Sequence, residues 1–267
     1  MARHKVDYSK KYLQVISLGA GKQSSYMLIK ALEGKFGIKP DIAVFADTGN
    51  EPDFVYSYLK WLQEYVWKRF KFKIAIVSSG DIIADTLNHV SGKTTWSPTP
   101  PFWFSTSGAL RRQCTLHLKI RPVRKYVRKI AGDRPVKMWI GISLDEMERM
   151  KSSGVKYITN FYPLVKNRVT ISEIKESYKK MGVPEPGKSS CVICPFHSDS
   201  YWQRIRKVEP HSFKMACDFD EKIRKFSSSH NEVFLHRSKV PLKNIDFNYT
   251  NSLYPELIEE CEGLCGL

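Results

Sequence analysis

Cysteine spacing is the first feature of this sequence that points to chemistry. Cys191 and Cys194 are separated by two residues, and Cys114 precedes them in the chain. Thiolates at that spacing can present both sulfurs to one metal ion or cluster. Three sulfurs suit an iron–sulfur cluster with one iron free of protein ligands, whereas adding His197 would give a Cys3His zinc site. Polar residues on both sides of Cys191 and Cys194 argue against a structural pair of buried cysteines. We therefore predict a metal site, which could hold either an iron–sulfur cluster or zinc.

The other cysteines have different surroundings. Cys217 has Phe213 one helical turn before it, which is typical of a buried structural thiol. The irregular segment around Cys261 and Cys265 could carry both thiols into an active site as nucleophiles or sulfur carriers, provided that a thiolate is available. A pair of surface thiols without a role is the alternative. Cys261 and Cys265 are therefore candidate catalytic residues.

A run of small residues could bind phosphate. Ser17-Leu-Gly-Ala-Gly-Lys-Gln-Ser-Ser25 lies between an apolar strand pattern and a helical pattern. Small side chains let backbone N–H groups approach phosphate oxygens, and a helix N-terminus favours negative charge. The spacing of a Walker A loop is absent, and a tight turn with a serine cap is the alternative. The candidate nucleotide-binding residues here are Ser17, Gly19, Ala20, Gly21, Lys22, Gln23, Ser24 and Ser25.

An acidic turn follows the second strand pattern. Asp47 and Thr48 stand at the carboxyl end of that strand, which in a doubly wound sheet lies beside the phosphate loop. A carboxylate there can hold Mg²⁺ or a ribose hydroxyl. An Asp-Thr-Gly turn that caps the next helix is the alternative, and the position favours a functional role.

Positive charge is in excess. The 267 residues contain 43 Lys and Arg against 27 Asp and Glu, a formal net charge of +16. This excess indicates a polyanionic partner, with a generally basic surface as the alternative. Eight of the cations and no acid fall between Arg111 and Lys129, where Arg121, Lys125 and Lys129 share a helical face. Such a run could hold a nucleic-acid backbone or the phosphates of a small nucleotide.

The elements that must position these residues alternate as a parallel α/β sheet requires. The strand patterns are Leu13–Leu18, Asp41–Ala46, Lys73–Val77 and Val136–Ile142, with helical patterns over Ser24–Phe36 and Phe54–Phe70. We therefore predict an α/β fold with a doubly wound, mostly parallel sheet and a ligand site beyond the carboxyl ends of its strands. Further helices are predicted over Ile171–Gly182, Ser198–Arg206 and Pro210–Phe226.

The chain divides into three predicted parts. Residues 1–150 form the nucleotide-binding core, residues 151–243 a helical region with the Cys-x2-Cys motif packed on that core, and residues 244–267 a tail. The segment Ser91–Gly108, rich in Pro, Ser, Thr and aromatics, is long enough to be a lid or a binding loop. No membrane span or secretion signal is apparent, and we expect a cytoplasmic protein with no membrane partner.

Together these motifs resemble the superfamily of PP-loop ATP pyrophosphatases that includes the adenosine-phosphosulfate and phosphoadenosine-phosphosulfate (PAPS) reductases. The segment from Gly19 to Ser24 stands where the family has Ser-Gly-Gly-x-Asp-Ser, and Asp47-Thr-Gly resembles the family's Asp-Thr-Gly. The family also has a Gly-Ile-Arg segment that is followed by an acid and an arginine. The corresponding segment here is Gly141-Ile-Ser-Leu-Asp145-Glu with Arg149. The resemblance implies an adenine nucleotide alpha hydrolase-like fold and adds Gly141, Asp145 and Arg149 to the candidate nucleotide-binding residues.

The cysteines also resemble the cluster-binding pattern of the adenosine-phosphosulfate reductases, with departures. Thr115 stands where those reductases have a second adjacent cysteine, which leaves Cys114, Cys191 and Cys194. A 4Fe–4S cluster with three cysteine ligands is similar to the arrangement in PP-loop enzymes that thiolate tRNA. In those enzymes the iron without a protein ligand can hold sulfur. Gln23 replaces the loop's usual Asp, which puts metal and phosphate contacts of that side chain in doubt. The whole set resembles short PAPS-reductase-like proteins of phages and bacteria and the ATPase subunit of DNA phosphorothioation systems.

Three functions follow from this resemblance. The first is an iron–sulfur sulfurtransferase that uses ATP with Mg²⁺ to adenylate a nucleic acid or nucleotide and takes sulfur from a donor. The second is a sulfonucleotide reductase, whose substrate is a phosphosulfate, whose reductant is a thiol and whose nucleophile is Cys265. The third is a non-catalytic nucleic-acid-binding protein with structural zinc.

Overall fold

A five-stranded parallel sheet forms the centre of the molecule. The computed structural model describes residues 6–106, 108–226 and 232–247. Its strand order is β3-β2-β1-β5-β6, and every neighbouring pair is parallel. The strands are β1 (Leu13–Leu18), β2 (Ile42–Asp47), β3 (Ile74–Ser78), β5 (Val136–Ile140) and β6 (Ile158–Phe161). The order reverses between β1 and β5, where a doubly wound sheet opens a crevice for ligands.

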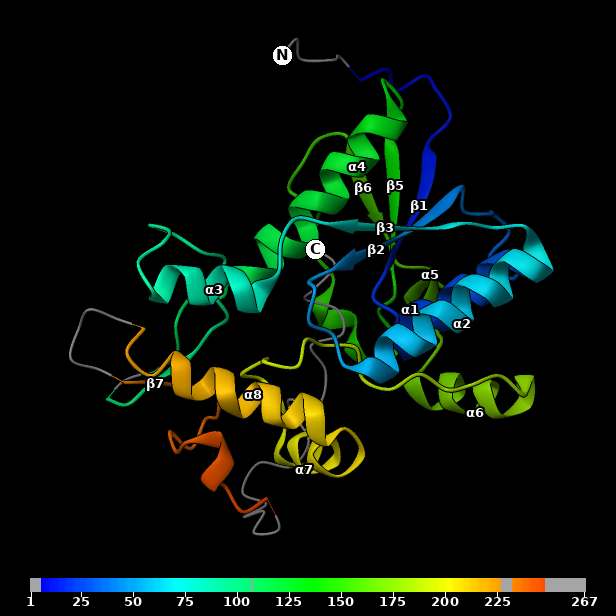
Figure 1. Ribbon diagram of the computed structural model, residues 1–267. Helices are drawn as coiled ribbons and strands as arrows, with labels where there is room; N and C mark the ends of the chain where they lie inside the picture. The colour runs from blue at the N-terminus through cyan, green and yellow to red at the C-terminus, as the bar shows by residue number, and fades with distance from the viewer. Residues whose placement is uncertain (1–5, 107, 227–231, 248–267) are drawn as a thin grey trace.

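Helices cover both faces of this sheet, as Figure 1 shows. One face carries α1 (Lys22–Leu32), α2 (Asp53–Phe70) and α6 (Ile171–Met181) over a buried cluster that includes Met27, Leu62 and Trp139. The other face carries α4 (Arg121–Ala131), whose Val123 and Val127 pack on Val15 and Met138. The prediction of a doubly wound parallel sheet is therefore confirmed.

Local sequence sets several helix ends. Asp81 caps α3 (Ile82–Val90) by accepting a hydrogen bond from the Ala84 backbone N–H at 2.8 Å. Thr170 and Glu173 form a reciprocal capping box at the start of α6, which ends at Gly182 in a left-handed conformation. Short turns complete this part of the chain: η1 (Thr115–Ile120), η2 (Leu144–Arg149) and α5 (Pro163–Lys166).

A second core lies in the later part of the chain. It packs α7 (Asp199–Val208) and α8 (Pro210–Lys222) with η3 (Leu242–Asn244) and a two-stranded ribbon, through buried residues such as Phe102, Trp202 and Phe219. The ribbon pairs β4 (Trp103–Phe104) with β7 (Val233–Phe234) in antiparallel register. The buried Asp220 carboxylate accepts hydrogen bonds from the Leu235 and Leu242 backbones at 2.7 and 3.0 Å, which fixes this segment to α8.

Several predicted elements differ from the observed ones. The fourth predicted strand ends at Ile140 rather than Ile142, and the first predicted helix ends at Leu32 rather than Phe36 because Gly34 takes a left-handed conformation. The helix α3 and the strand β6 were not expected from the patterns. Pairing with a buried neighbour makes the short sequence of β6 a strand, and that is a tertiary effect. No helix in the described residues is long and apolar enough to cross a membrane.

Gly141 determines how closely the sheet approaches the loop of residues 19–25. A Cβ atom at this position would lie 2.7 Å from the Cα and 2.8 Å from the backbone nitrogen of Ser24. Because those are backbone atoms at the start of α1, they cannot rotate away. Glycine is therefore required where β5 ends against the loop.

We predict that Gly141→Ala lowers the free energy of unfolding by about 1–3 kcal/mol because the methyl group overpacks a rigid contact. Chemical denaturation followed by circular dichroism measures this. Gly108→Ala is the matched control, since a Cβ atom added there would meet nothing within 4 Å and the φ of Gly108 is not positive. Equal stability of the two variants would contradict the argument.

Candidate functional site

A pocket opens at the carboxyl ends of β1, β2 and β5. A concave site at the ends of the strands is where α/β proteins usually bind small molecules and cofactors. Of the sequence-predicted nucleotide residues, Ser17, Gly19, Gly21, Gln23, Ser24 and Gly141 line it. It lies at the reversal of strand order, as the sequence predicts for a nucleotide site.

The loop from Gly19 to Ser25 is held by its own hydrogen bonds and by a distant segment. The backbone N–H of Gly19 donates to Ser24 Oγ at 3.1 Å, and Ser25 N–H donates to the Gly21 carbonyl at 3.1 Å. Ser189 donates to the carbonyl of Gly19. Ala20 is buried in a left-handed conformation with φ of 57°. These contacts preorganise the turn that precedes α1.

Lys22 does not line the pocket. Its ammonium pairs with Glu185 at 2.8 Å, and its carbonyl accepts a hydrogen bond from Tyr178 at 2.9 Å. The structure thus uses Lys22 to fasten the start of α1 to the α6 region. Ser25 is fully buried beneath the loop.

Gln23 connects the loop to the segment after β5. The side chain is 1% exposed, and its amide nitrogen donates to Ser143 Oγ at 3.0 Å and to Glu146 Oε2 at 2.8 Å. Glu146 also pairs with Arg149. An aspartate at position 23 could not donate to Glu146, so the Gln side chain fits this acidic neighbour. The motif residues Gln23 and Arg149 therefore meet at one carboxylate.

Three other predicted nucleotide residues have structural contacts outside the pocket lining. Asp47 Oδ1 accepts hydrogen bonds from the Tyr56 hydroxyl and the Gly49 backbone, both at 2.8 Å. Thr48 is buried and donates to Glu51 Oε1 at 3.1 Å. Asp145 accepts from the Ile171 backbone N–H at 2.6 Å at the start of α6.

A second pocket brings the three predicted cysteine ligands together. Cys114, Cys191 and Cys194 all line it, although Cys114 lies far away in the sequence. The Cys194 side chain hydrogen-bonds to that of Cys191, which lowers the pKa of Cys191, but burial and the charge of Glu51 outweigh this and the net pKa shift is upward. Cys217 lies elsewhere, in the second core, where burial raises its pKa to about 11. It therefore acts as a structural thiol.

His197 packs behind the cysteine turn. Its Nε2 contacts the Cys191 carbonyl at 3.0 Å, and its ring stacks on Tyr201 with centroids 3.8 Å apart. Burial, followed by the charge of Lys188, holds the pKa of His197 well below its usual value. Among the described residues, His197 does not line the cysteine pocket.

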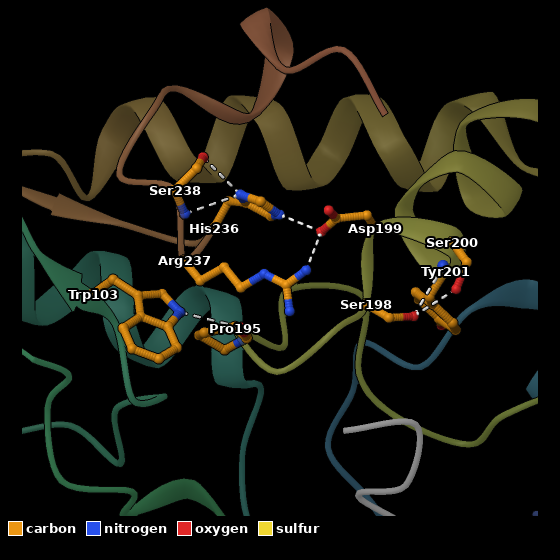
Figure 2. Close-up of polar contacts among 9 residues, drawn as sticks. All are labelled: Trp103, Pro195, Ser198, Asp199, Ser200, Tyr201, His236, Arg237 and Ser238. Carbon is orange, nitrogen blue, oxygen red and sulfur yellow. Dashed lines mark hydrogen bonds and ion pairs between the residues drawn. The ribbon is translucent and has the colours of Figure 1, made fainter. Parts of the chain in front are cut away.

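Contacts from the ribbon and from the segment after it hold the cysteine turn (Figure 2). Trp103 Nε1 donates to the Pro195 carbonyl at 3.2 Å. At the start of α7, Asp199 Oδ1 lies 2.9 Å from His236 Nε2 and 3.1 Å from Arg237. Phe234, next to this second anchor, pairs with Trp103 across the ribbon. Two contacts on the carboxyl side of the cysteine turn thus come from chain segments remote from it in sequence.

Lys119 borders both pockets. It lines the nucleotide pocket and the cysteine pocket, and its ammonium lies 3.2 Å from Glu51 Oε1. The Glu51 side chain is fully buried, and its Oε2 has no hydrogen-bond partner among the described residues. A buried ion pair therefore lies at the boundary of the two sites.

Sequence motifs missed several residues of the nucleotide pocket. Lys119 and Arg124 lay in the predicted basic run, which was the available signal, whereas Ser189 was noted only as a polar neighbour of the cysteines. Arg124 donates to the Ser153 carbonyl at the pocket wall. Ser153 and Asn160 had no signal, because the strand β6 that brings Asn160 to the sheet was not predicted.

Cysteine thiolates are the type of ligand that iron–sulfur clusters require. Three sulfurs share a pocket with the cationic side chains of Lys119 and Arg112, whose charge would offset that of the thiolates. Within the described residues, no three His, Cys, Asp or Glu side chains are arranged closely enough to hold a metal ion. The candidate catalytic residues Cys261 and Cys265 lie outside the described residues.

Comparison with known proteins gives distant similarities. No family model matches the sequence. The chain is 24% identical over 197 residues to an uncharacterized nin region protein, ORF290, of Escherichia phage lambda, covering 68% of this chain and 65% of that protein. The match therefore spans slightly less than two thirds of the relative's length.

Two solved structures are similar to this chain. One is phosphoadenylyl-sulfate (PAPS) reductase from Candida auris in a phosphate complex, with 12% identity, a TM-score of 0.42 and coverage of 66% of this chain and 76% of that chain. The other is the U34-tRNA thiolase NcsA from Methanococcus maripaludis with its 4Fe–4S cluster. Its identity to this chain is 14% and its TM-score 0.41, and the match covers 85% of this chain and 76% of that chain.

The buried ion pair gives a prediction. We expect Glu51→Gln to lower the free energy of unfolding by about 3 kcal/mol, because Lys119 loses its opposite charge in a desolvated site. Urea denaturation at pH 7 measures the change. Lys180→Met removes one partner of the exposed pair Lys180–Glu176 and should have little effect.

Adding Lys119→Met to Glu51→Gln should restore part of the lost stability, since no uncompensated charge is then buried. If Glu51→Gln is as stable as Lys180→Met, the ion pair does not have the energetic role argued here.

Proposed function

We propose that this protein is an ATP-dependent enzyme of sulfur transfer that adenylates an oxygen of a nucleic acid or nucleotide. The observation that carries the proposal is that Lys119 lines both the candidate nucleotide pocket and the three-cysteine pocket. Two sites that share a wall can act on one substrate in sequence. The order of motifs along the chain, as set out from the sequence, supports the same conclusion.

The pocket residues have separate roles in the adenylation step. The backbone of the loop at Gly19 and Gly21 would bind the phosphates of ATP, with Mg²⁺ and the cations Lys119 and Arg124 neutralising charge. The acceptor oxygen would attack the α-phosphorus and release pyrophosphate. Alignment of the two reactants and charge stabilisation are the main sources of rate acceleration for such a transfer.

The sulfur step follows on the adenylated acceptor. A hydrosulfide supplied by a donor would attack the atom that bears the adenylate, and AMP would leave with the original oxygen. Cys114, Cys191 and Cys194 would hold an iron–sulfur cluster, which when bound supplies an iron without a protein ligand beside the acceptor. Cys261 and Cys265 remain predicted as sulfur carriers.

Nucleotide binding tests the first half of the proposal. Arg124→Ala should weaken ATP binding about 10- to 150-fold, since a charge-assisted hydrogen bond contributes about 1.5–3 kcal/mol. Equilibrium dialysis with labelled ATP measures the dissociation constant. Arg69→Ala on α2, outside the pocket lining, is the control and should bind ATP like the unaltered protein.

Exchange of labelled pyrophosphate into ATP then tests adenylation. We expect exchange that increases when RNA or DNA is added. Sulfite release from a phosphosulfate without ATP consumption would favour the sulfonucleotide reductase instead. Absence of both ATP binding and exchange would contradict the proposal.

Metal content tests the cysteine pocket. Anaerobically purified protein should contain iron and acid-labile sulfide, and Cys194→Ser should lose most of both, because one of three ligands is removed. Cys217→Ser, outside the pocket lining, is the matched control and should retain them. Zinc without sulfide would contradict the cluster and favour a structural metal site.

A further inference from the structure

A third hollow lies on a face of α4 that the two pockets described above do not use. This groove runs between the edge strand β3 and α4, and the segment that follows α3 also lines it. Figure 1 shows β3, α3 and α4 around this region. None of the proposed roles so far uses it. The side chains that bear on its function are Asp85, Trp96, His117, Arg121, Lys125 and Lys129.

An exposed aromatic platform lies in the groove. Trp96 is 49% exposed, and its ring centroid is 4.5 Å from that of His117, with the two ring planes tilted by 53°. Burial and the charge of Arg121 lower the pKa of His117. The exposed ring of Trp96 is a surface on which a flat heterocycle can stack, with His117 beside it.

A row of cations continues from this platform. Arg121, Lys125 and Lys129 are exposed and follow one another at four-residue intervals, so they form a line along α4 with a rise of about 6 Å between members. Arg121 NH1 lies 2.9 Å from His117 Nδ1, which joins the first cation to the aromatic pair. Among the described residues no ion pair engages Lys125 or Lys129. The row therefore presents positive charge at regular spacing beside the stacking surface.

The remaining lining agrees with a polyanionic ligand. Asp85 is the acid among the described residues that line the groove, and burial followed by the charge of Asp81 raises its pKa. The other faces of α4 are already engaged. Arg124 lies at the nucleotide pocket, and the Arg128 guanidinium lies 4.9 Å from the Tyr157 ring. The basic run thus divides into cations that serve the fold or the pocket and cations that face the groove.

We propose that this groove binds a single-stranded segment of nucleic acid, with one base stacked on the exposed ring of Trp96 and the following phosphates along Arg121, Lys125 and Lys129. A single strand fits because stacking on Trp96 needs an unpaired base, and cations with aromatics are the usual means of binding one. The proposal deepens the proposed function by naming the surface that holds the acceptor strand. His117 and Lys119 both belong to η1, so a strand in the groove lies next to the pocket wall.

Binding measured without ATP tests this groove by itself. Fluorescein-labelled 12-nucleotide single strands of RNA and of DNA, and the corresponding duplexes, are titrated with the full chain and followed by anisotropy. Trp96→Ala should weaken single-strand binding roughly 5- to 150-fold, as expected for the loss of one stacked base. Duplex binding should change less, and the stronger of the two single strands identifies the sugar that the groove prefers.

Salt dependence tests the cationic row. Replacing Lys125 and Lys129 together by Ala should reduce the magnitude of the log–log salt slope for single strands by about 1.4, because each phosphate contact contributes about 0.7. Trp67→Ala with Lys71→Ala is the matched control, since Trp67 is 46% exposed on α2 with the Lys71 ammonium 5.7 Å from its ring. That control should bind like the unaltered protein.

Two results would overturn the proposal. One is single-strand affinity of Trp96→Ala within twofold of the control variant, which would mean that bases do not stack there. The other is binding of heparin, a polyanion without bases, that responds to every variant as the single strands do. Failure of ATP binding with intact single-strand binding would contradict the proposed function alone, whereas intact ATP binding without single-strand binding would contradict the groove alone.

Discussion

The buried ion pair of Lys119 and Glu51 is the contact on which the arrangement of the sites depends. Glu51 follows the β2 strand, and Lys119 belongs to η1, immediately before α4. Placing a carboxylate in a fully desolvated position is costly unless an opposite charge lies within reach. The lysine therefore has to occupy the boundary between the two pockets. Once Lys119 is there, η1 cannot move away without leaving the buried carboxylate of Glu51 uncompensated.

Neighbouring hydrogen bonds extend this constraint to the cysteine turn. The backbone N–H of Val192 donates to the Asn50 carbonyl at 2.8 Å, and Ile82 N–H donates to the Thr48 carbonyl at 3.1 Å. The short segment after β2 thus holds the cysteine turn on one side and the start of α3 on the other. Gly49 allows this close approach, because its φ is 81° and a Cβ atom there would lie only 3.1 Å from the carboxylate of the residue that caps α3. One turn after β2 consequently contacts both the cysteine turn and the helix α3, whose Asp85 lines the groove.

Much of the fold was predictable from sequence, because many of its elements are determined by local residue patterns. The strands β1, β2 and β3 are apolar runs followed by glycine or acidic turns, whereas β6 and the ribbon of β4 and β7 are short and exist only through pairing with distant strands. The candidate sites divide along the same line. Cys191 and Cys194 were identifiable because their spacing is local. Lys119 and Trp96 were visible only as members of a basic run and of an aromatic-rich loop, because their importance arises from burial beside a carboxylate and from contact with a histidine ring in the folded chain.

The net charge of +16 takes on a more specific meaning in this fold. A uniformly basic surface would attract any polyanion, and its cations would have no particular spacing. Here Arg124 of α4 lines the candidate nucleotide pocket, whereas Lys125, the next residue, lines the groove. Adjacent residues on a helix point about 100° apart, so a single short helix can serve two anionic ligands without their charges meeting. An acid-free run is what such a helix requires, because an acid on either face would repel one of the two ligands.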